Sequence, residues 1–137
     1  MGKLLRPGGW WAVLWNAFGD SRLQDPFHDA TKSLLNKPLS PSLGNGGVPF
    51  ALDAEARLAA LERTDAFDSV EHRTSAWSVV LDPDQTVALY TTYSNVNIRP
   101  DREDVLNELR RIACNDFQGC MTRKMVTSLY VARRRRA

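Results

Sequence analysis

A short apolar run directly after a glycine-rich turn places the strongest constraint on how this chain folds. Six consecutive apolar residues, Trp10 to Trp15, follow Pro7-Gly8-Gly9. The run is too short for a helix and is rich in aromatic and branched side chains, which is typical of a strand buried on both faces. A buried helical turn is the alternative, but two adjacent glycines are a poor start for a helix. We therefore expect a parallel, central strand.

Two helices are predicted after this strand. Asp25-Pro26 provides a capping carboxylate and a proline suited to the first helical position, and this helix is expected to end near Asn36. Asp53 is expected to cap a second helix that ends near Arg63.

The next signals predict a strand and then a helix with a well-defined start. Residues 67–80 are rich in branched and aromatic side chains, which predicts a strand with an irregularity in its middle. Asp82 is followed by a proline, and Gln85 stands three positions after Asp82. This spacing predicts a reciprocal capping box, so a helix is expected to follow.

The last third of the chain predicts one further helix and a final strand. A helix is expected to begin near Asp101 and to stop at Gly119. Residues 124–132 alternate between two faces that both have little polar character. This pattern predicts a final strand in the interior of the sheet.

The predicted order of elements indicates an α/β fold, with a small sheet and flanking helices. The chain has 137 residues, of which 43% are hydrophobic and 25% are charged, and this is typical of one ordinary globular domain. We expect residues 1–132 to form a single α/β unit and residues 133–137 to form a basic tail.

The charge distribution argues against a nucleic-acid-binding protein. The net charge is +2, but four of the cations are the run Arg133 to Arg136, so the rest of the chain sums to −2. A nucleic-acid-binding domain normally carries its basic patch on the folded body. The arginine run is interpreted as a solubilising tail, with contact to an anionic surface as the alternative.

Membrane, export and metal signals are not found in the sequence. No apolar run approaches the roughly 18 residues of a membrane span, and no secretory signal pattern is present, so we expect a cytoplasmic protein. The cysteines Cys114 and Cys120 and the histidines His28 and His72 lack the spacings of a zinc site. A disulfide between the cysteines would be unusual in a reducing compartment.

The chain resembles the C-terminal half of a class I S-adenosylmethionine-dependent methyltransferase. The resemblance rests on the turn Leu4-Leu5-Arg6-Pro7-Gly8-Gly9, the apolar strand that ends in Trp15-Asn16, and the C-terminal segment Ser128 to Arg133. It implies a Rossmann-like sheet in which residues 5–16, 69–80 and 124–132 match the fifth, sixth and seventh strands. The seventh strand of this family lies antiparallel between the fifth and the sixth.

The resemblance also implies a cofactor, S-adenosylmethionine, whose main binding residues precede the fifth strand in this family. The glycine cluster Gly44 to Gly47 does not replace them, because no strand comes before it, and it is interpreted as a loop rather than a phosphate-binding turn. We therefore expect a part of a methyltransferase, acting on a small-molecule acceptor, that is inactive by itself. Three origins stay open: a fragment, one half of a split enzyme, or a non-catalytic interaction or dimerisation module.

A fifth strand without a fourth would leave Trp10 to Trp15 as an unpaired apolar edge. Such an edge is an aggregation hazard or a docking surface. We expect self-association through this strand, or binding of an N-terminal partner half.

Candidate site residues follow from the position of ligands in open α/β sheets, outside the carboxyl ends of parallel strands. Trp15 and Asn16 stand at that end of the first strand, and Phe18 and His28 follow it. These four residues are the candidates for contacting a substrate, with core packing as the alternative for Trp15 and a turn as the alternative for Asn16. His28 is considered as a general base, as is His72, although both are also compatible with surface positions. The sequence assigns no catalytic residue.

Overall fold

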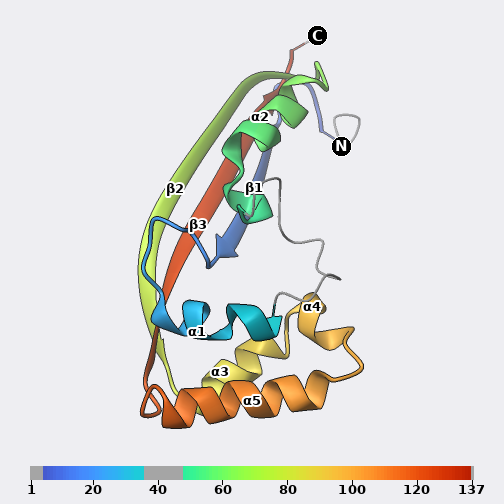
Figure 1. Cartoon of the computed structure of the whole chain (residues 1–137). Helices are drawn as coiled ribbons and strands as arrows, with labels where there is room; N and C mark the ends of the chain where they lie inside the picture. Colours follow the sequence, from blue (N-terminus) through green and yellow to red (C-terminus); the bar gives the residue numbers. More distant parts are fainter. Residues whose placement is uncertain (1–4, 36–47, 137) are drawn as a thin grey trace.

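The computed structural model describes residues 5–35 and 48–136, and they form a curved three-stranded sheet with helices along one side (Figure 1). The strands are β1 (Trp10–Ala17), β2 (Phe67–Leu81) and β3 (Met121–Arg134). β3 lies in the middle and pairs antiparallel with both neighbours, in the order β1-β3-β2. The α/β class with flanking helices is therefore confirmed, as is the interior position of the last strand.

β1 and β2 are not paired with each other but run in the same direction, because both are antiparallel to β3. Two parallel strands need a long crossover between them. The crossover between β1 and β2 contains α1 (Pro26–Leu35), the short 3₁₀ helix η3 (Phe50–Leu52) and α2 (Ala54–Glu62). This strand order is the one that the resemblance implies for the last three strands of its sheet.

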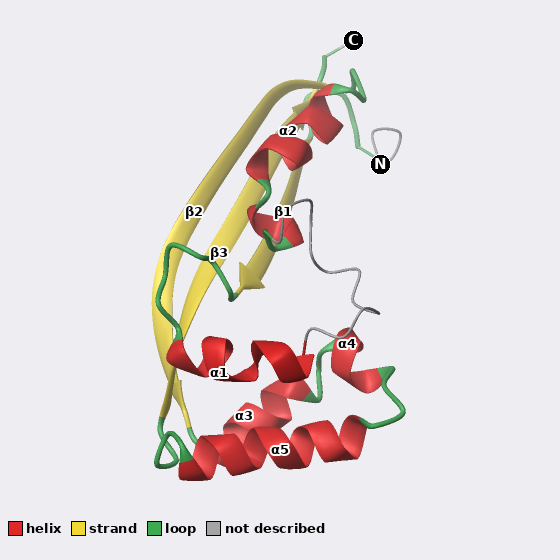
Figure 2. Ribbon diagram, viewed as in Figure 1, coloured by secondary structure: helices red, strands yellow, loops and turns green. Residues whose placement is uncertain are grey.

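The connection from β2 to β3 contains α3 (Pro83–Tyr90), α4 (Ser94–Asn97) and α5 (Arg102–Asn115). α3 and α5 lie together with α1 at one end of the sheet, and α2 lies toward the other end (Figure 2). Their main core is apolar and consists of Phe27, Leu35, Tyr90, Val96, Val105, Leu106, Leu109, Ile112, Ala113 and Met121.

The predicted helix boundaries are confirmed where local capping sets them. The Asp82 side chain accepts from the Gln85 amide at 2.7 Å, and the Gln85 side chain accepts from the Asp82 amide at 3.0 Å. Asp53 accepts from the amide of Ala56, at the start of α2. Gly119 has a φ of +74° and donates to the carbonyl of Ala113, but α5 ends four residues before the expected stop, at Asn115, with Asp116 as its C-cap.

The side of β3 that is buried changes halfway along the strand. From Ala132 to Val126 the even-numbered residues are buried, whereas from Met125 to Met121 the odd-numbered ones are. The change falls at Val126, which pairs with Ala17, the last residue of β1. Two-stranded ribbons twist strongly, so beyond the end of β1 the ribbon of β2 and β3 presents its other face to the helices. This explains why both faces of the strand have little polar character in the sequence.

The prediction that the first strand is central, parallel to its neighbour and buried on both faces is wrong, because β1 is an edge strand that pairs antiparallel with β3. β1 pairs only with β3 among the described residues, and its burial alternates. Trp10 is 55% exposed and Leu14 58% exposed, because the helices cover the other face of β1. The expectation of an unpaired apolar edge fits this arrangement.

Three smaller differences concern local detail. The irregularity of β2 lies between Phe67 and Ser69, at its start and not in its middle. α4 was not expected, because four residues are too few to show a helical period. β3 continues through Arg134, so part of the basic run belongs to a strand, and Arg135 pairs with Asp65 at 2.8 Å.

The last two expectations concern membrane-spanning segments and the glycine cluster. No helix in residues 5–35 and 48–136 has both the length and the apolar character that crossing a membrane requires. The glycine cluster Gly44 to Gly47 lies outside the described residues.

Candidate functional site

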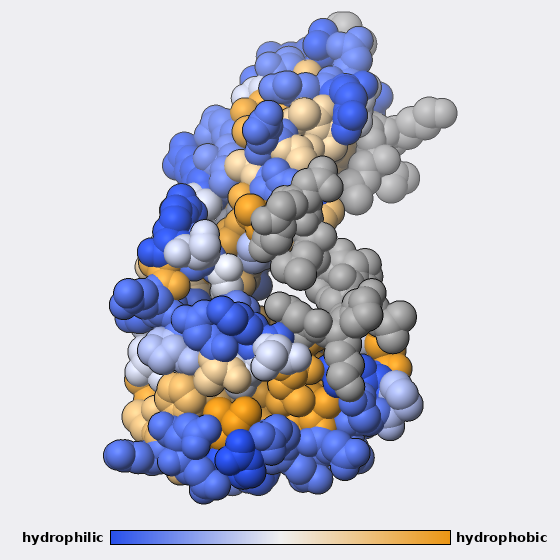
Figure 3. Space-filling model, in the orientation of Figure 1, coloured by the Kyte–Doolittle hydropathy of each residue, from blue (hydrophilic) through white to orange (hydrophobic). Residues whose placement is uncertain are grey.

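A cavity of about 620 Å³ opens at the carboxyl end of β1. It is bounded by α1, by η3 and by the turn between α3 and α4, and Figure 3 shows the surface hollowed in this region. Its size is within the range of small-molecule sites, which is roughly 300 to 1,000 Å³. The described residues that line it are Trp15, Asn16, Ala17, Phe18, Gly19, His28, Lys32, Leu35, Pro49, Phe50, Ala51, Tyr90, Thr92, Tyr93, Ser94 and Asn95.

All four residues selected from the sequence line this cavity. Trp15 lies on the face of β1 that the helices cover, whereas Asn16 lies on the exposed face, because neighbouring residues of a strand point to opposite sides. The amide oxygen of Asn16 accepts from the hydroxyl of Thr127 at 2.7 Å. That hydroxyl accepts in turn from the Trp77 indole at 2.9 Å.

The wall of the cavity is mostly aromatic. Phe18 stacks on Tyr93 with 5.6 Å between ring centroids, and it meets the imidazole of His28 edge to face at 5.5 Å. Trp15 meets Phe50 edge to face at 5.8 Å. Such pairs add stability beyond their buried area, so these ring contacts stabilise the wall.

Tyr93 keeps its proton at neutral pH. Burial is the main cause that raises its pKa, to about 12, and the neighbouring Tyr90 adds to the effect. Tyr93 therefore presents a neutral phenol to the cavity.

Phe50 separates this cavity from a smaller hollow of about 340 Å³ between α2 and the sheet. Trp15 and Phe50 line both. The guanidinium of Arg57 lies 3.6 Å from the centroid of Phe50, which is a cation–π contact. Phe50 is therefore held from both sides, by Trp15 and by Arg57.

A buried ion pair supports the site from behind. The guanidinium of Arg123 on β3 donates to Asp25 at 2.9 Å and to the Tyr90 hydroxyl at 2.8 Å. Asp25 also accepts from the amides of His28 at 2.9 Å and Lys124 at 3.1 Å. It thereby caps α1 as expected and joins that helix to β3.

The contacts of Asp25 and Arg123 determine the protonation state of both side chains. Burial alone would raise the pKa of Asp25, but the amide of His28 and the guanidinium of Arg123 outweigh it and hold the pKa below its usual range. The aromatic rings of Phe18 and Phe27 lie 4.8 and 5.1 Å from the guanidinium carbon of Arg123. Asp25 is therefore ionised and Arg123 charged at neutral pH.

Sequence reasoning missed Arg123. Its only sequence signal is a cation between the apolar residues Met121 and Met125 on one face of the final strand. The side chain is fully buried, and a buried charge needs a partner, yet its partner stands 98 positions earlier in the chain.

His28 presents a neutral imidazole to the cavity. Burial is the main cause that lowers its pKa, and the charge of Arg123 adds to the effect more than Asp25 opposes it. The Nδ1 atom is buried and has no hydrogen-bond partner among the described residues. Gly19, with a φ of +81°, lies against the ring, and a Cβ there would sit 3.0 Å from it.

The other histidine does not lie in this cavity. His72 stacks on Tyr130 with 4.2 Å between ring centroids, and its Nε2 lies 2.8 Å from the hydroxyl of Ser128. Burial lowers its pKa. His72 therefore belongs to the interface between β2 and β3, and His28 is the histidine at the cavity.

The described residues do not fit S-adenosylmethionine. β1 is followed by Phe18-Gly19-Asp20, which contains a single glycine, and β2 runs directly into the capping box of α3. Neither turn is the glycine-rich connection from strand to helix that holds such a cofactor. The described part of the cavity therefore lacks the glycine-rich turn that this cofactor requires.

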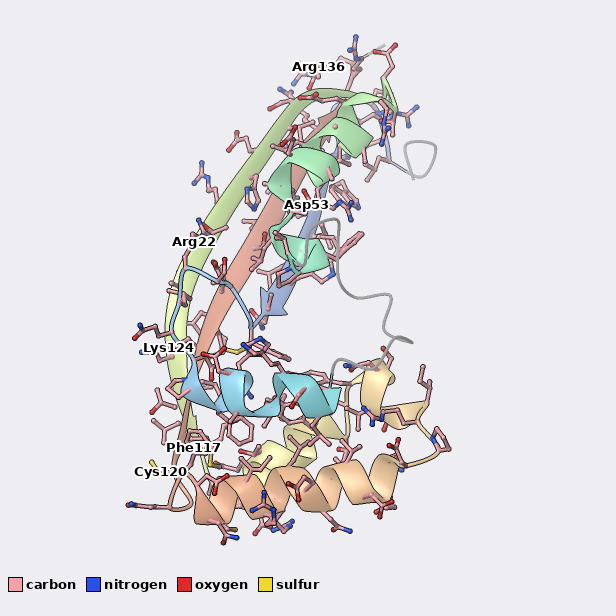
Figure 4. The ribbon with its side chains drawn as sticks, viewed as in Figure 1. Arg22, Asp53, Phe117, Cys120, Lys124 and Arg136 are labelled. Atoms are coloured by element: carbon pink, nitrogen blue, oxygen red, sulfur yellow. The ribbon has the colours of Figure 1, made fainter. Side chains whose placement is uncertain are left out.

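Metal ligands do not gather in the part of the chain that the structure describes, since it contains no group of three or more His, Cys, Asp or Glu side chains that could hold an ion. Cys114 and Cys120 are free and exposed. Cys120 lies near Phe117 at the turn from α5 to β3 (Figure 4).

The chain was compared with models of protein families and with curated proteins. No family model matches it. No curated protein matches it either.

Proposed function

We propose that this chain forms the acceptor-binding, C-terminal portion of a methyltransferase domain that uses S-adenosylmethionine and acts on a small molecule. The observation that carries the proposal is the strand order, in which β3 lies antiparallel between the parallel strands β1 and β2. This is the arrangement of the fifth, seventh and sixth strands in the family that the turn at Arg6-Pro7-Gly8-Gly9 resembles.

The position of the cavity supports the same proposal. In open α/β sheets ligands lie outside the carboxyl ends of the parallel strands, and the cavity opens where β1 ends. Its aromatic wall and neutral His28 suit a small organic molecule. Methyl transfer needs mainly alignment of the acceptor with an activated methyl group, so an acceptor pocket is the contribution this portion would make.

The free thiols fit the proposed cytoplasmic location. Cys114 and Cys120 are both exposed, and neither forms a disulfide. Exposed reduced cysteines are normal in a reducing compartment.

The experiment is cofactor binding by calorimetry, on the chain alone and on the chain together with the polypeptide encoded immediately upstream of Met1. We expect no binding of S-adenosylmethionine by the chain alone and binding by the combination. Binding of S-adenosylmethionine by the chain alone would contradict the proposal that this chain supplies the acceptor site without the cofactor site. An upstream sequence without a strand followed by a Gly-x-Gly turn would remove the basis for a methyltransferase.

A second function, a non-catalytic interaction or dimerisation module, is favoured by the open edge of β1. The strand has no charged residue, and Trp10 and Leu14 are exposed beside that edge. Natural proteins usually protect such edges with charges, proline or a covering element. Self-association of the chain without any cofactor binding, alone or in combination, would support this second function.

A further inference from the structure

Lys32, the charged side chain among the described lining residues, and the histidine His28 lie along one turn of α1. His28 and Lys32 are four residues apart, which places them on the same side of a helix, and both line the cavity. The ammonium of Lys32 has one weak ion pair, to Asp29 at 3.3 Å, and the side chain is 56% exposed. It is therefore available to a ligand.

The sign of the charge in the cavity is positive. Among the described residues that line it, Lys32 is charged and none is acidic. Behind the wall, Arg123 affects the His28 imidazole more strongly than Asp25 does. A cationic ligand would find no carboxylate to pair with, although aromatic rings alone can attract an ammonium group.

The remaining wall suits a flat ring. Trp15, Phe18 and Tyr93 present aromatic faces and edges, and Phe18 and Tyr93 are already stacked with an interplanar angle of 28°. Aromatic rings add most binding energy to other rings in offset or edge-to-face arrangements. His28 is a neutral polar ring of this wall and lies one helical turn before Lys32, so the polar end of the ligand is expected near these two residues.

We propose that this cavity binds a planar aromatic carboxylate, with its ring among Trp15, Phe18 and Tyr93 and its carboxylate toward His28 and Lys32. The proposal rests on the proposed function in taking the cavity as the acceptor site, but the binding itself needs no cofactor. An imidazole N–H donates to the carboxylate, and the ammonium of Lys32 pairs with it.

The test is calorimetry on the whole chain with three probes that share one ring: naphthoate, naphthamide and naphthylmethylammonium. We expect naphthoate to bind roughly tenfold more tightly than naphthamide, because a charge-assisted contact contributes more than a neutral one. The ammonium probe is expected to bind weakest. Equal binding of naphthoate and naphthamide, or tightest binding of the ammonium, would overturn the proposal.

Two substitutions locate the carboxylate. Lys32→Gln is expected to weaken naphthoate roughly threefold while leaving naphthamide unchanged, the size typical of an exposed ion pair. His28→Gln is expected to weaken naphthoate further. Lys124→Gln is the matched control, because Lys124 contacts Ser78 and does not line the cavity. If the ratio of the naphthoate affinity to the naphthamide affinity is unchanged in Lys32→Gln, the carboxylate lies elsewhere. Because Lys32 is exposed, this variant keeps the test valid if the His28 variant does not fold.

The outcomes separate this proposal from the proposed function. Selective naphthoate binding together with failure of the cofactor experiment would keep the carboxylate site and remove the methyltransferase. Cofactor binding by the combined polypeptides without naphthoate selectivity would do the reverse.

Discussion

Arg123 on β3 and Asp25 at the start of α1 form an ion pair of 2.9 Å in which both side chains are almost completely buried. The two residues are 98 positions apart, so the pair joins the first helix of the chain to its last strand. Because Asp25 also caps α1, one carboxylate sets both the start of that helix and its position beside the cavity.

Arg123→Met should destabilise the chain by about 3 kcal/mol, because it leaves Asp25 buried without its cation. Urea unfolding followed by circular dichroism measures the loss. Arg111→Met is the control, since Arg111 pairs with Glu108 on the surface of α5 and its loss should have little effect. Equal effects of the two substitutions would show that the buried pair is unimportant.

Gly19→Ala should weaken naphthoate binding as well as stability. The new Cβ would lie 3.0 Å from the His28 ring, at a φ of +81° that disfavours alanine. Gly119→Ala provides the matched control, because its φ is +74° but its Cβ would meet only ordinary contacts at 3.9 Å. Both variants should lose about 1 kcal/mol from backbone conformation, and only Gly19→Ala should lose affinity in calorimetry.

Stability should fall as the pH is lowered through about 6.5, the usual pKa of histidine. Burial lowers the pKa of both His28 and His72 in the folded chain, so below that pH the unfolded chain binds more protons. The contribution is complete above pH 6.5 and is lost as the pH falls toward the lowered values. Urea midpoints across this range measure it, and a smaller decline in His28→Gln is expected. A midpoint independent of pH would contradict the lowered pKa values.

Self-association through β1 should be reduced by Leu14→Lys. Leu14 is 58% exposed beside the open edge, and a lysine there opposes pairing with another copy. Sedimentation velocity at increasing concentration measures the change. Val80→Lys is a suitable control, because Val80 is 59% exposed but lies on β2. If the unmodified chain sediments as a monomer at all concentrations, the expected association is absent.

The sequence predicted the features that depend on residues close together in the chain. Asp53 and Asp82 mark helix starts through contacts within a few positions, and the structure places those starts as expected. A rule about strand ends selected Trp15 and Asn16, and Phe18 and His28 were added because they lie in the segment that follows. All four line one cavity.

What the sequence missed depends on contacts between distant segments. The opposite wall of the cavity, from Tyr90 to Asn95 and from Pro49 to Ala51, meets Trp15 only after the two crossovers have folded. The burial of β1 was also misjudged, because an apolar run does not reveal how many neighbours a strand has. The partner of Arg123 could not be chosen among 16 acidic residues without the fold.

The change of buried face along β3 lets one strand face two different surroundings. Tyr130 is buried near η3, where its hydroxyl donates to the carbonyl of Ala51, and Met121 is buried in the apolar core around Leu109 among α1, α3 and α5. A single strand passes through both, so the two halves unfold as one unit only as long as β3 remains intact. Loss of cooperativity would therefore begin at Met125 and Val126, where the buried face of the strand changes.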